Sequence, residues 1–259
     1  MKYWRRYLVL ALASYLLFVI TQLPASKVYY FTENLLQEQG VTFYGVQGSI
    51  WNGSATAVTY QDMHLKQIAW EIHPLALLTA NVSATVRFKQ KENSVNALVS
   101  RSFFGSTKVE GGQLRIDAED LVKLAKLPAI KLQGQFSLNL TQLKLGEKNV
   151  ESIQGRAVWS NASSTFPQKM ELGDLFADMT TSSDGVIQIK LGDAGGPLEM
   201  DANLQLTPDA KYDFKGQFAS RQGRNSSLGR SLGFMGRYNN EGKVEFNKAG
   251  ELSEFGFLF

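Results

Sequence analysis

The residues that could carry chemistry are two histidines, each placed two positions after an acidic residue. His64 follows Asp62, and His73 follows Glu71. On an extended strand, residues two apart share one face, so each pair could point the same way. A zinc or other transition-metal site needs three or more such ligands, and each pair alone is incomplete. The spacing favours structural or solvent-exposed histidines, and we expect no metal site.

Two further patterns resemble chemical sites but lack the partners that those sites need. Asp117, Glu119 and Asp120 form an acidic cluster, yet they open a helical pattern, where helix N-terminal capping accounts for them. Residues 192–196 (GDAGG) are glycine-rich, but no helix with a lysine follows, as a phosphate-binding loop requires.

Catalysis and cofactor binding therefore find little support in the sequence. There is no cysteine, which excludes disulfides, thiolate metal sites and a cysteine nucleophile. No G-x-S-x-G serine motif occurs. We predict a protein that is not an enzyme, with no catalytic residues and no cofactor.

The charge distribution argues against a nucleic-acid partner. The 259 residues include 27 Lys or Arg and 24 Asp or Glu, which gives a formal net charge of +3. Lys2, Arg5 and Arg6 account for this excess, because no acidic residue lies among the first six positions. The remainder is balanced, whereas nucleic-acid binding needs a concentrated basic face.

Residues 7–23 form an uncharged, mostly apolar run of 17 residues, YLVLALASYLLFVITQL. As a helix this run would be about 25 Å long, close to the thickness of a bilayer's hydrocarbon core. It predicts a single-pass transmembrane anchor made by Tyr7, Leu8, Leu12, Leu16, Phe18, Ile20 and Leu23. The basic residues Lys2, Arg5 and Arg6 precede it, so the positive-inside rule places the N-terminus in the cytoplasm. A cleaved signal peptide is the alternative, but the run is long for one and Leu-Pro-Ala-Ser is a poor cleavage site.

Beyond the apolar run, the pattern changes from helical spacing to a two-residue alternation. Residues 24–40 read as an amphipathic juxtamembrane helix that ends at Gly40. Apolar and polar residues then alternate over residues 82–88, 198–206 and 211–218, and also around 68–72, 114–116, 130–140 and 187–191. One apolar and one polar face is typical of antiparallel strands. Short helices are expected at residues 117–127, before Pro128, and at 225–233.

The predicted fold is mostly β. One transmembrane helix precedes an antiparallel β-sheet domain, an open, twisted sheet or groove with two or three short helices. The predicted boundaries are a cytoplasmic N-terminus (1–6), the anchor (7–23), the juxtamembrane helix (24–40) and one periplasmic β domain (41–259). No low-complexity linker divides this last part.

The most distinctive stretch is residues 45–78, which contain two tryptophans among regularly placed glycines. The first element holds Gly45, Gly48, Ser49, Trp51, Gly53 and Ala55, and the second holds Trp70, Pro74, Leu77 and Leu78. The glycines permit tight turns or close backbone approach. The tryptophans are interpreted as core anchors or, alternatively, as an aromatic interface for a partner.

These elements resemble the N-protein family of the type II, or general, secretion pathway, in the forms G-x-x-G-S/T-x-W-x-G-x-A and W-x-x-x-P-x-x-L-L. The resemblance implies an accessory, non-enzymatic component of the bacterial inner membrane whose partners are the bilayer and the secretion machine's inner-membrane subunits. The family is also similar in architecture to AsmA-like periplasmic proteins. That similarity implies an alternative function, a groove that binds a lipid or another hydrophobic ligand.

Overall fold

The computed structural model describes residues 4–60, 63–90, 92–124, 131–146, 149–165 and 169–255. The chain divides into two compact units, residues 1–90 and residues 91–259. No glycine- or proline-rich linker marks this boundary in the sequence.

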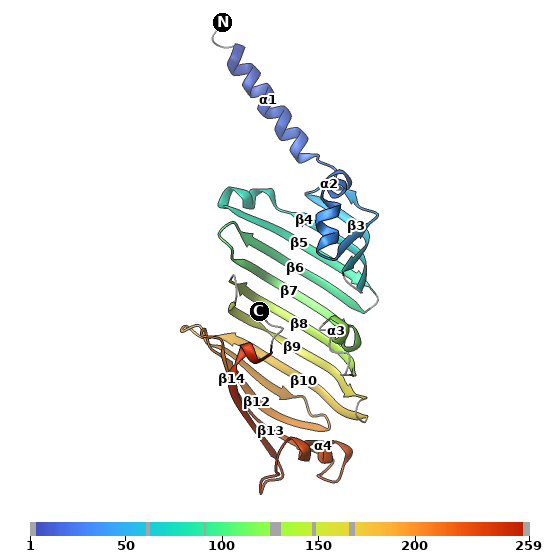
Figure 1. Cartoon of the computed structure of the whole chain (residues 1–259), viewed down its shortest axis with the longest axis vertical. Coiled ribbons are helices and arrows are strands. Elements are labelled where there is room, and N and C mark those ends of the chain that lie inside the picture. Colours follow the sequence, from blue (N-terminus) through green and yellow to red (C-terminus); the bar gives the residue numbers. More distant parts are fainter. Residues whose placement is uncertain are drawn as a thin grey trace. The chain divides into compact units, whose positions relative to one another are not determined.

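Unit 1 combines helices α1 (Trp4–Thr21) and α2 (Ala25–Glu38) with an antiparallel sheet. Its strands are β1 (Val41–Tyr44), β2 (Gln47–Gly48), β3 (Asn52–Tyr60), β4 (Met63–Ile72) and β5 (Asn81–Gln90), and the 3-10 helix η1 (Pro74–Thr79) connects the last two. The strands pair in the order β1-β3-β4-β5, and β2 pairs with β3. Figure 1 shows α2 in front of the strands of this sheet.

Helices α1 and α2 lie in the N-terminal part of the chain, where the sequence predicts helices. Helix α2 lies within the range of residues 24–40 where a helix is expected, and Gly40 follows it with a φ of 75°, a left-handed conformation that suits glycine. Helix α1 contains most of the uncharged run, and the basic Arg5 and Arg6 lie in its first turn. Among the residues that the structure describes, no helix is both long enough and apolar enough to count as a membrane span.

Unit 2 is an antiparallel meander in which each strand pairs with the next along the chain. Its elements are β6 (Asn93–Ser102), β7 (Thr107–Asp117), α3 (Ala118–Leu124), β8 (Leu132–Leu145), β9 (Val150–Ser164), β10 (Met170–Thr181), β11 (Ile187–Asp193), β12 (Leu198–Leu206), β13 (Lys211–Ser220), α4 (Ser227–Met235), β14 (Val244–Glu251) and the 3-10 helix η2 (Leu252–Phe255). The order runs from β6 to β14 without closing on itself. The mostly β, open antiparallel sheet with few short helices is therefore confirmed.

Individual elements follow the predicted pattern closely where the alternation is strong. The alternating residues 198–206 coincide with β12, and 211–218 lie within β13. Helix α4 begins two residues after the predicted start, because the Ser226 hydroxyl accepts a hydrogen bond from the Gly229 N–H and caps the helix there. Helix α3 begins at Ala118, one residue after the predicted start, because Asp117 ends β7, and its predicted end before Pro128 lies outside the described residues.

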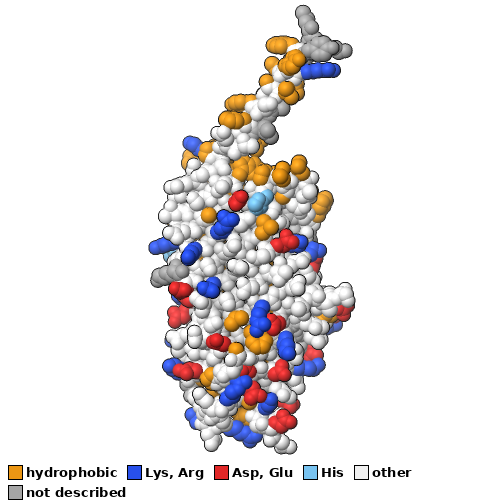
Figure 2. Space-filling view, turned by 180° about the vertical axis from the view of Figure 1, so that it is seen from behind, with side chains coloured by type: hydrophobic (Ala, Val, Ile, Leu, Met, Phe, Trp, Pro, Cys, Tyr) orange, Lys and Arg blue, Asp and Glu red, His pale blue; other side chains and the backbone are white. Residues whose placement is uncertain are grey.

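The two faces of the unit 2 sheet differ in polarity, as the alternation predicts. On one face, Phe136, Trp159 and Leu175 lie side by side on β8, β9 and β10, and the Phe136 and Trp159 rings stack with centroids 4.8 Å apart. On the other face, Arg156 lies opposite Asp178, with 3.4 Å between guanidinium and carboxylate. Figure 2 shows acidic and basic side chains interspersed over the lower part of the molecule.

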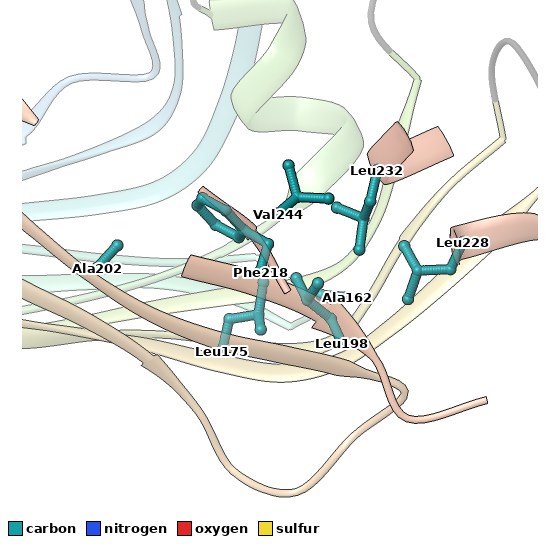
Figure 3. Close-up of a cluster of buried hydrophobic side chains, with 8 residues drawn as sticks. All are labelled: Ala162, Leu175, Leu198, Ala202, Phe218, Leu228, Leu232 and Val244. Carbon is teal, nitrogen blue, oxygen red and sulfur yellow. The ribbon is translucent and has the colours of Figure 1, made fainter. Parts of the chain in front are cut away.

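The apolar face of unit 2 is best covered near its C-terminal strands. There Leu228 and Leu232 of α4 pack against Leu198, Phe218 and Val244 of the sheet. Figure 3 shows these side chains gathered together with Ala162 and Leu175, while Ala202, a further member of the cluster, lies to one side in this view. Because α4 buries apolar strand residues that would otherwise face water, it supplies a core to this part of the sheet.

In the glycine-rich loop of residues 192–196, the side chain of Asp193 binds backbone N–H groups. The Asp193 carboxylate accepts hydrogen bonds from the Gly195 N–H (2.9 Å) and the Met200 N–H (2.8 Å), and from the Arg221 guanidinium (2.7 Å). The same guanidinium donates to the carbonyl oxygens of Gly196 and Leu198. Asp193 and Arg221 thus fasten the hairpin between β11 and β12 to the end of β13.

Burial raises the pKa of the Asp193 carboxyl, but the hydrogen bonds from Arg221, Met200 and Gly195 outweigh it, and the pKa lies below its usual value. A carboxyl whose pKa is lowered by folding stabilises the protein above its unfolded pKa and loses this effect as the pH falls through the folded value. We predict that Asp193→Asn lowers the free energy of unfolding at pH 7 by about 1.5–3 kcal/mol. The deficit should shrink below about pH 4.

Urea denaturation of the full chain in detergent, repeated between pH 3 and pH 7, measures this difference. Asp209→Asn is the matched control, because Asp209 is exposed and pairs only with surface groups such as Lys211. An Asp193→Asn deficit that stayed constant with pH would show that the carboxylate charge is not what stabilises the hairpin.

Candidate functional site

The distinctive motif forms a tight turn that contacts the end of helix α1. Residues 49–51 connect β2 to β3, and the Ser49 N–H donates to the carbonyl oxygen of Asn52, the first residue of β3 (2.9 Å). The Ser49 hydroxyl in turn accepts a hydrogen bond from the Asn52 N–H (3.0 Å). Ile50 and Trp51 lie at the tip of this turn, which we call the tryptophan turn.

The tryptophan turn binds carbonyl groups at and just after the end of α1. The indole N–H of Trp51 donates to the Ile20 carbonyl oxygen at 2.7 Å, and the Ile50 N–H donates to that of Leu23 at 3.0 Å. The last carbonyls of a helix need such partners because no following turn supplies them. These bonds connect α1 to the sheet of unit 1.

Trp51 also reaches the other half of the motif. Its carbonyl oxygen accepts a hydrogen bond from the Ile72 N–H at 2.6 Å, two residues before η1 begins at Pro74. Proline suits the first position of a helix, where its missing N–H costs nothing. Trp51 therefore lies between the end of α1 and the start of η1.

The glycines of the motif are explained by close contacts. A Cβ atom on Gly53 would lie 2.4 Å from the Trp70 ring, and one on Gly48 would lie 2.5 Å from the Asn52 carbonyl oxygen. Gly45 and Gly48 also adopt φ values of 63° and 81°, which glycine tolerates best. Larger residues would force the tryptophan turn apart.

An apolar cavity of about 390 Å³ lies between α2 and the sheet of unit 1. Its lining comes from α2 (Ala25, Val28, Tyr29, Thr32 and Leu36) and from the sheet and its turns (Phe43, Val46, Ile50, Ile68, Trp70, Ile72 and Val86). Aromatic rings line one part, because Tyr29 meets Phe43 edge-on at 5.6 Å and Phe43 meets Trp70 at 6.3 Å. The volume is within the usual range of small-molecule sites.

The polar atoms in the cavity lining all have partners within the protein. The Tyr29 hydroxyl accepts a hydrogen bond from the Phe43 N–H, the Thr32 hydroxyl donates to the Val28 carbonyl, and the Trp70 indole donates to the Ile50 carbonyl. No lining residue carries a formal charge. The cavity suits an apolar group.

The structure brings together the motif residues predicted from sequence: Gly45, Gly48, Trp51, Gly53, Trp70 and Pro74 all lie in or beside the tryptophan turn and the cavity. Of the predicted anchor residues, Tyr7, Leu8, Leu12, Phe18 and Ile20 are exposed along α1, and Leu23 is half-buried after it. The side chains of Leu16 and Arg5 and all of Lys2 lie outside the described residues, whereas Arg6 is exposed.

The histidines do not form a metal site within the described part of the chain, where no group of three metal-ligating residues occurs. His64 contacts the Thr59 hydroxyl at 2.9 Å, and His73 contacts that of Thr85 at 3.0 Å. Asp62, the predicted neighbour of His64, lies outside the described residues. The sequence did not point to Tyr29, Phe43 or Val86 as lining residues, because their approach depends on how α2 packs on the sheet.

Comparison with known proteins identifies the chain's relatives. Residues 39–247 match the family described as type II secretion system (T2SS), protein N. The chain belongs to this family. A type II secretion system protein N from Vibrio cholerae is 26% identical over 240 residues, covering 90% of this chain and 93% of the relative. The protein of that name from Klebsiella pneumoniae is 24% identical and covers 80% and 82%. No solved structure matches.

Membership of the protein N family confirms the resemblance carried by the two motif elements. The matched range begins after α2 and ends within β14, so it includes the tryptophan turn and η1 but not α1. The family is described as a component of the type II secretion system.

The contact between Gly53 and Trp70 gives a direct test of the motif. We predict that Gly53→Ala displaces the Trp70 ring and lowers the free energy of unfolding by about 1–3 kcal/mol, as overpacking does in other proteins. Tryptophan fluorescence during urea unfolding measures both effects.

Gly233→Ala serves as the control. Gly233 lies in α4, and a Cβ there would meet only the Tyr238 ring, at an ordinary 3.6 Å. Stability should stay unchanged or rise, because alanine favours helices. Equal effects of the two substitutions would contradict the assigned role of Gly53.

Proposed function

We propose that this chain is an accessory, non-enzymatic component of the type II secretion machinery, held in the inner membrane by α1 and acting through protein contacts in the periplasm. The observation that carries the proposal is the family match over residues 39–247. The exposed apolar helix and the open sheet support the more specific statements about anchoring and contacts.

The proposed anchor rests on the side chains of α1. Apolar residues are exposed around this helix, among them Leu8, Leu12, Phe18 and Ile20. A helix that is apolar all round needs an apolar environment, which a bilayer supplies. Arg5 and Arg6 at its start favour a cytoplasmic N-terminus and a periplasmic body.

The proposed protein contacts use the last strand of unit 2. Strand β14 pairs with β13 on one side and stands at the end of the strand order. An end strand presents backbone groups to which another chain can add a strand. By contrast, the Tyr29 hydroxyl of α2 binds the N–H of Phe43 in β1, the strand at the other end of the chain's sheet order. Strand β14 is therefore the better docking edge.

Site-specific photo-crosslinking in cells that produce the secretion machine tests this edge. A crosslinking residue at Asn247, exposed on β14, should capture an inner-membrane subunit of the machine. The same residue at Asn139, exposed on the central strand β8, is the matched control and should capture much less. Equal capture at both positions, or none at Asn247, would contradict docking at β14.

A second candidate function is favoured by the cavity between α2 and the sheet: binding a lipid or another hydrophobic ligand. The uncharged lining would accept an acyl chain without desolvating any unpaired polar group. This function is of a different class, because it makes the protein a carrier or sensor of an apolar molecule and not only a structural subunit.

Native mass spectrometry of the full chain released from detergent tests the second candidate. A bound acyl-chain lipid should appear on the natural protein and be lost in Val86→Trp, which fills the cavity. Val150→Trp makes the same change at an exposed position of β9 and should keep the ligand. A natural protein that carries no lipid, or equal retention in both variants, would argue against a carrier function.

A further inference from the structure

We propose that the leucine-rich segment η1 is a second membrane contact, which inserts into the interfacial layer of the bilayer that holds α1. The inference rests on the proposed anchor and adds a site that the anchor alone does not imply. The segment and α1 both belong to unit 1, and two hydrogen bonds of Trp51 relate them within this compact unit.

The first observation is the exposure of large apolar side chains in this short segment. Leu75 is 77% exposed and Leu78 is 83% exposed, while Leu77 and the following Val82 are partly exposed as well. Single exposed leucines are ordinary on protein surfaces, but four apolar side chains within eight residues form a patch. Figure 2 shows hydrophobic side chains gathered at the end of the body from which the N-terminal helix extends.

The second observation is the absence of charge. From residue 72 to residue 86 the sequence contains no Lys, Arg, Asp or Glu. Its one titratable side chain, His73, is held by the Thr85 hydroxyl. Moving a charged side chain into a bilayer is costly, and this segment has none to move.

The third observation is the position of η1 beside the end of α1. Trp51 donates its indole N–H to the Ile20 carbonyl of α1 and accepts at its own carbonyl the N–H of Ile72, two residues before η1. Trp51, followed by Ile72 and His73, thus links the C-terminal end of the proposed anchor to the start of the leucine-rich segment. An anchor that ends at the membrane surface would bring η1 to the same level.

The membrane surface fits these observations better than a protein partner. Interfacial segments insert an apolar face about 5–10 Å into the boundary between head groups and acyl chains. Tryptophan favours this layer, and Trp51 lies close to the start of η1. A protein-binding patch would usually carry a polar rim with hydrogen-bonding groups, whereas the segment from Pro74 to Leu78 is apolar at every position.

Because the chain contains no cysteine, single cysteines can be labelled without other changes. Full-length protein with an environment-sensitive fluorophore at Leu78→Cys would be reconstituted into phosphatidylethanolamine–phosphatidylglycerol vesicles. Nitroxide-labelled lipids would then serve as quenchers. Leu78 is exposed, so the substitution leaves the fold intact. Leu12→Cys on α1 reports the anchor, and Tyr60→Cys is the control.

Tyr60 is a suitable control because it too is an exposed large apolar side chain in unit 1. It ends strand β3, which begins at the tryptophan turn, so it lies roughly 26 Å along the strand from that turn. We expect lipid nitroxides to remove most of the emission at positions 12 and 78 and little at position 60.

Quenching at position 12 with none at position 78 would overturn the membrane contact of η1 and leave the anchor standing. Loss of quenching at position 12 would overturn the anchor, and the inference with it. A probe at position 78 that stays in water until the machine's inner-membrane subunits are added would also overturn the inference, in favour of a protein-binding patch.

Discussion

A sheet with one apolar and one polar face must have its apolar face covered, and here few helices are available to do so. Each unit uses a helix for this purpose, and in the described part of unit 2 helix α3 also contacts β7 and β8. Helix α2 packs Tyr29 against Phe43 in unit 1, and α4 packs Leu228 and Leu232 against the strands around Val244 in unit 2. Other residues of the apolar face, such as Phe136 and Trp159, are only half-buried. Burial of apolar area is the main stabilising term in folding, so these two helices decide where the cores form.

The tryptophan turn solves a different problem, which is how to attach an apolar helix to a sheet. Trp51 donates to the end of α1 and accepts from β4, while Trp70 binds the carbonyl of Ile50 from the other side. Gly53 leaves room for the Trp70 ring. Each tryptophan thus makes a hydrogen bond that positions a backbone segment, a role that neither interpretation of the tryptophans from the sequence included.

The alternation of apolar and polar residues predicted most of the strands, since it depends only on which face of a strand is buried. It predicted residues 198–206 as a strand with the bounds that β12 has. It did not predict η1, because Pro74 and the leucines after it show no period of two. It also missed an irregularity in β4, where Gln67 adopts a φ of 59°. On the neighbouring strand β3, the buried positions shift there from odd-numbered residues, ending at Ala55, to the even-numbered Val58. The cavity could not be predicted, because its lining joins residues from α2, three strands and two turns.

The protein N motif consists of two sequence elements, and both contribute residues to the region around the tryptophan turn. The first element supplies the turn that holds α1, and the second supplies Trp70 and the start of η1. The uncharged runs at residues 7–23 and 72–86 are far apart in the sequence, yet Trp51 connects the end of one to the beginning of the other. Charged residues flank the second run on strands β4 and β5, where the Glu71 carboxylate lies 3.7 Å from the Arg87 guanidinium. This segregation is what a protein needs if one end of unit 1 is to meet lipid while its strands remain in water.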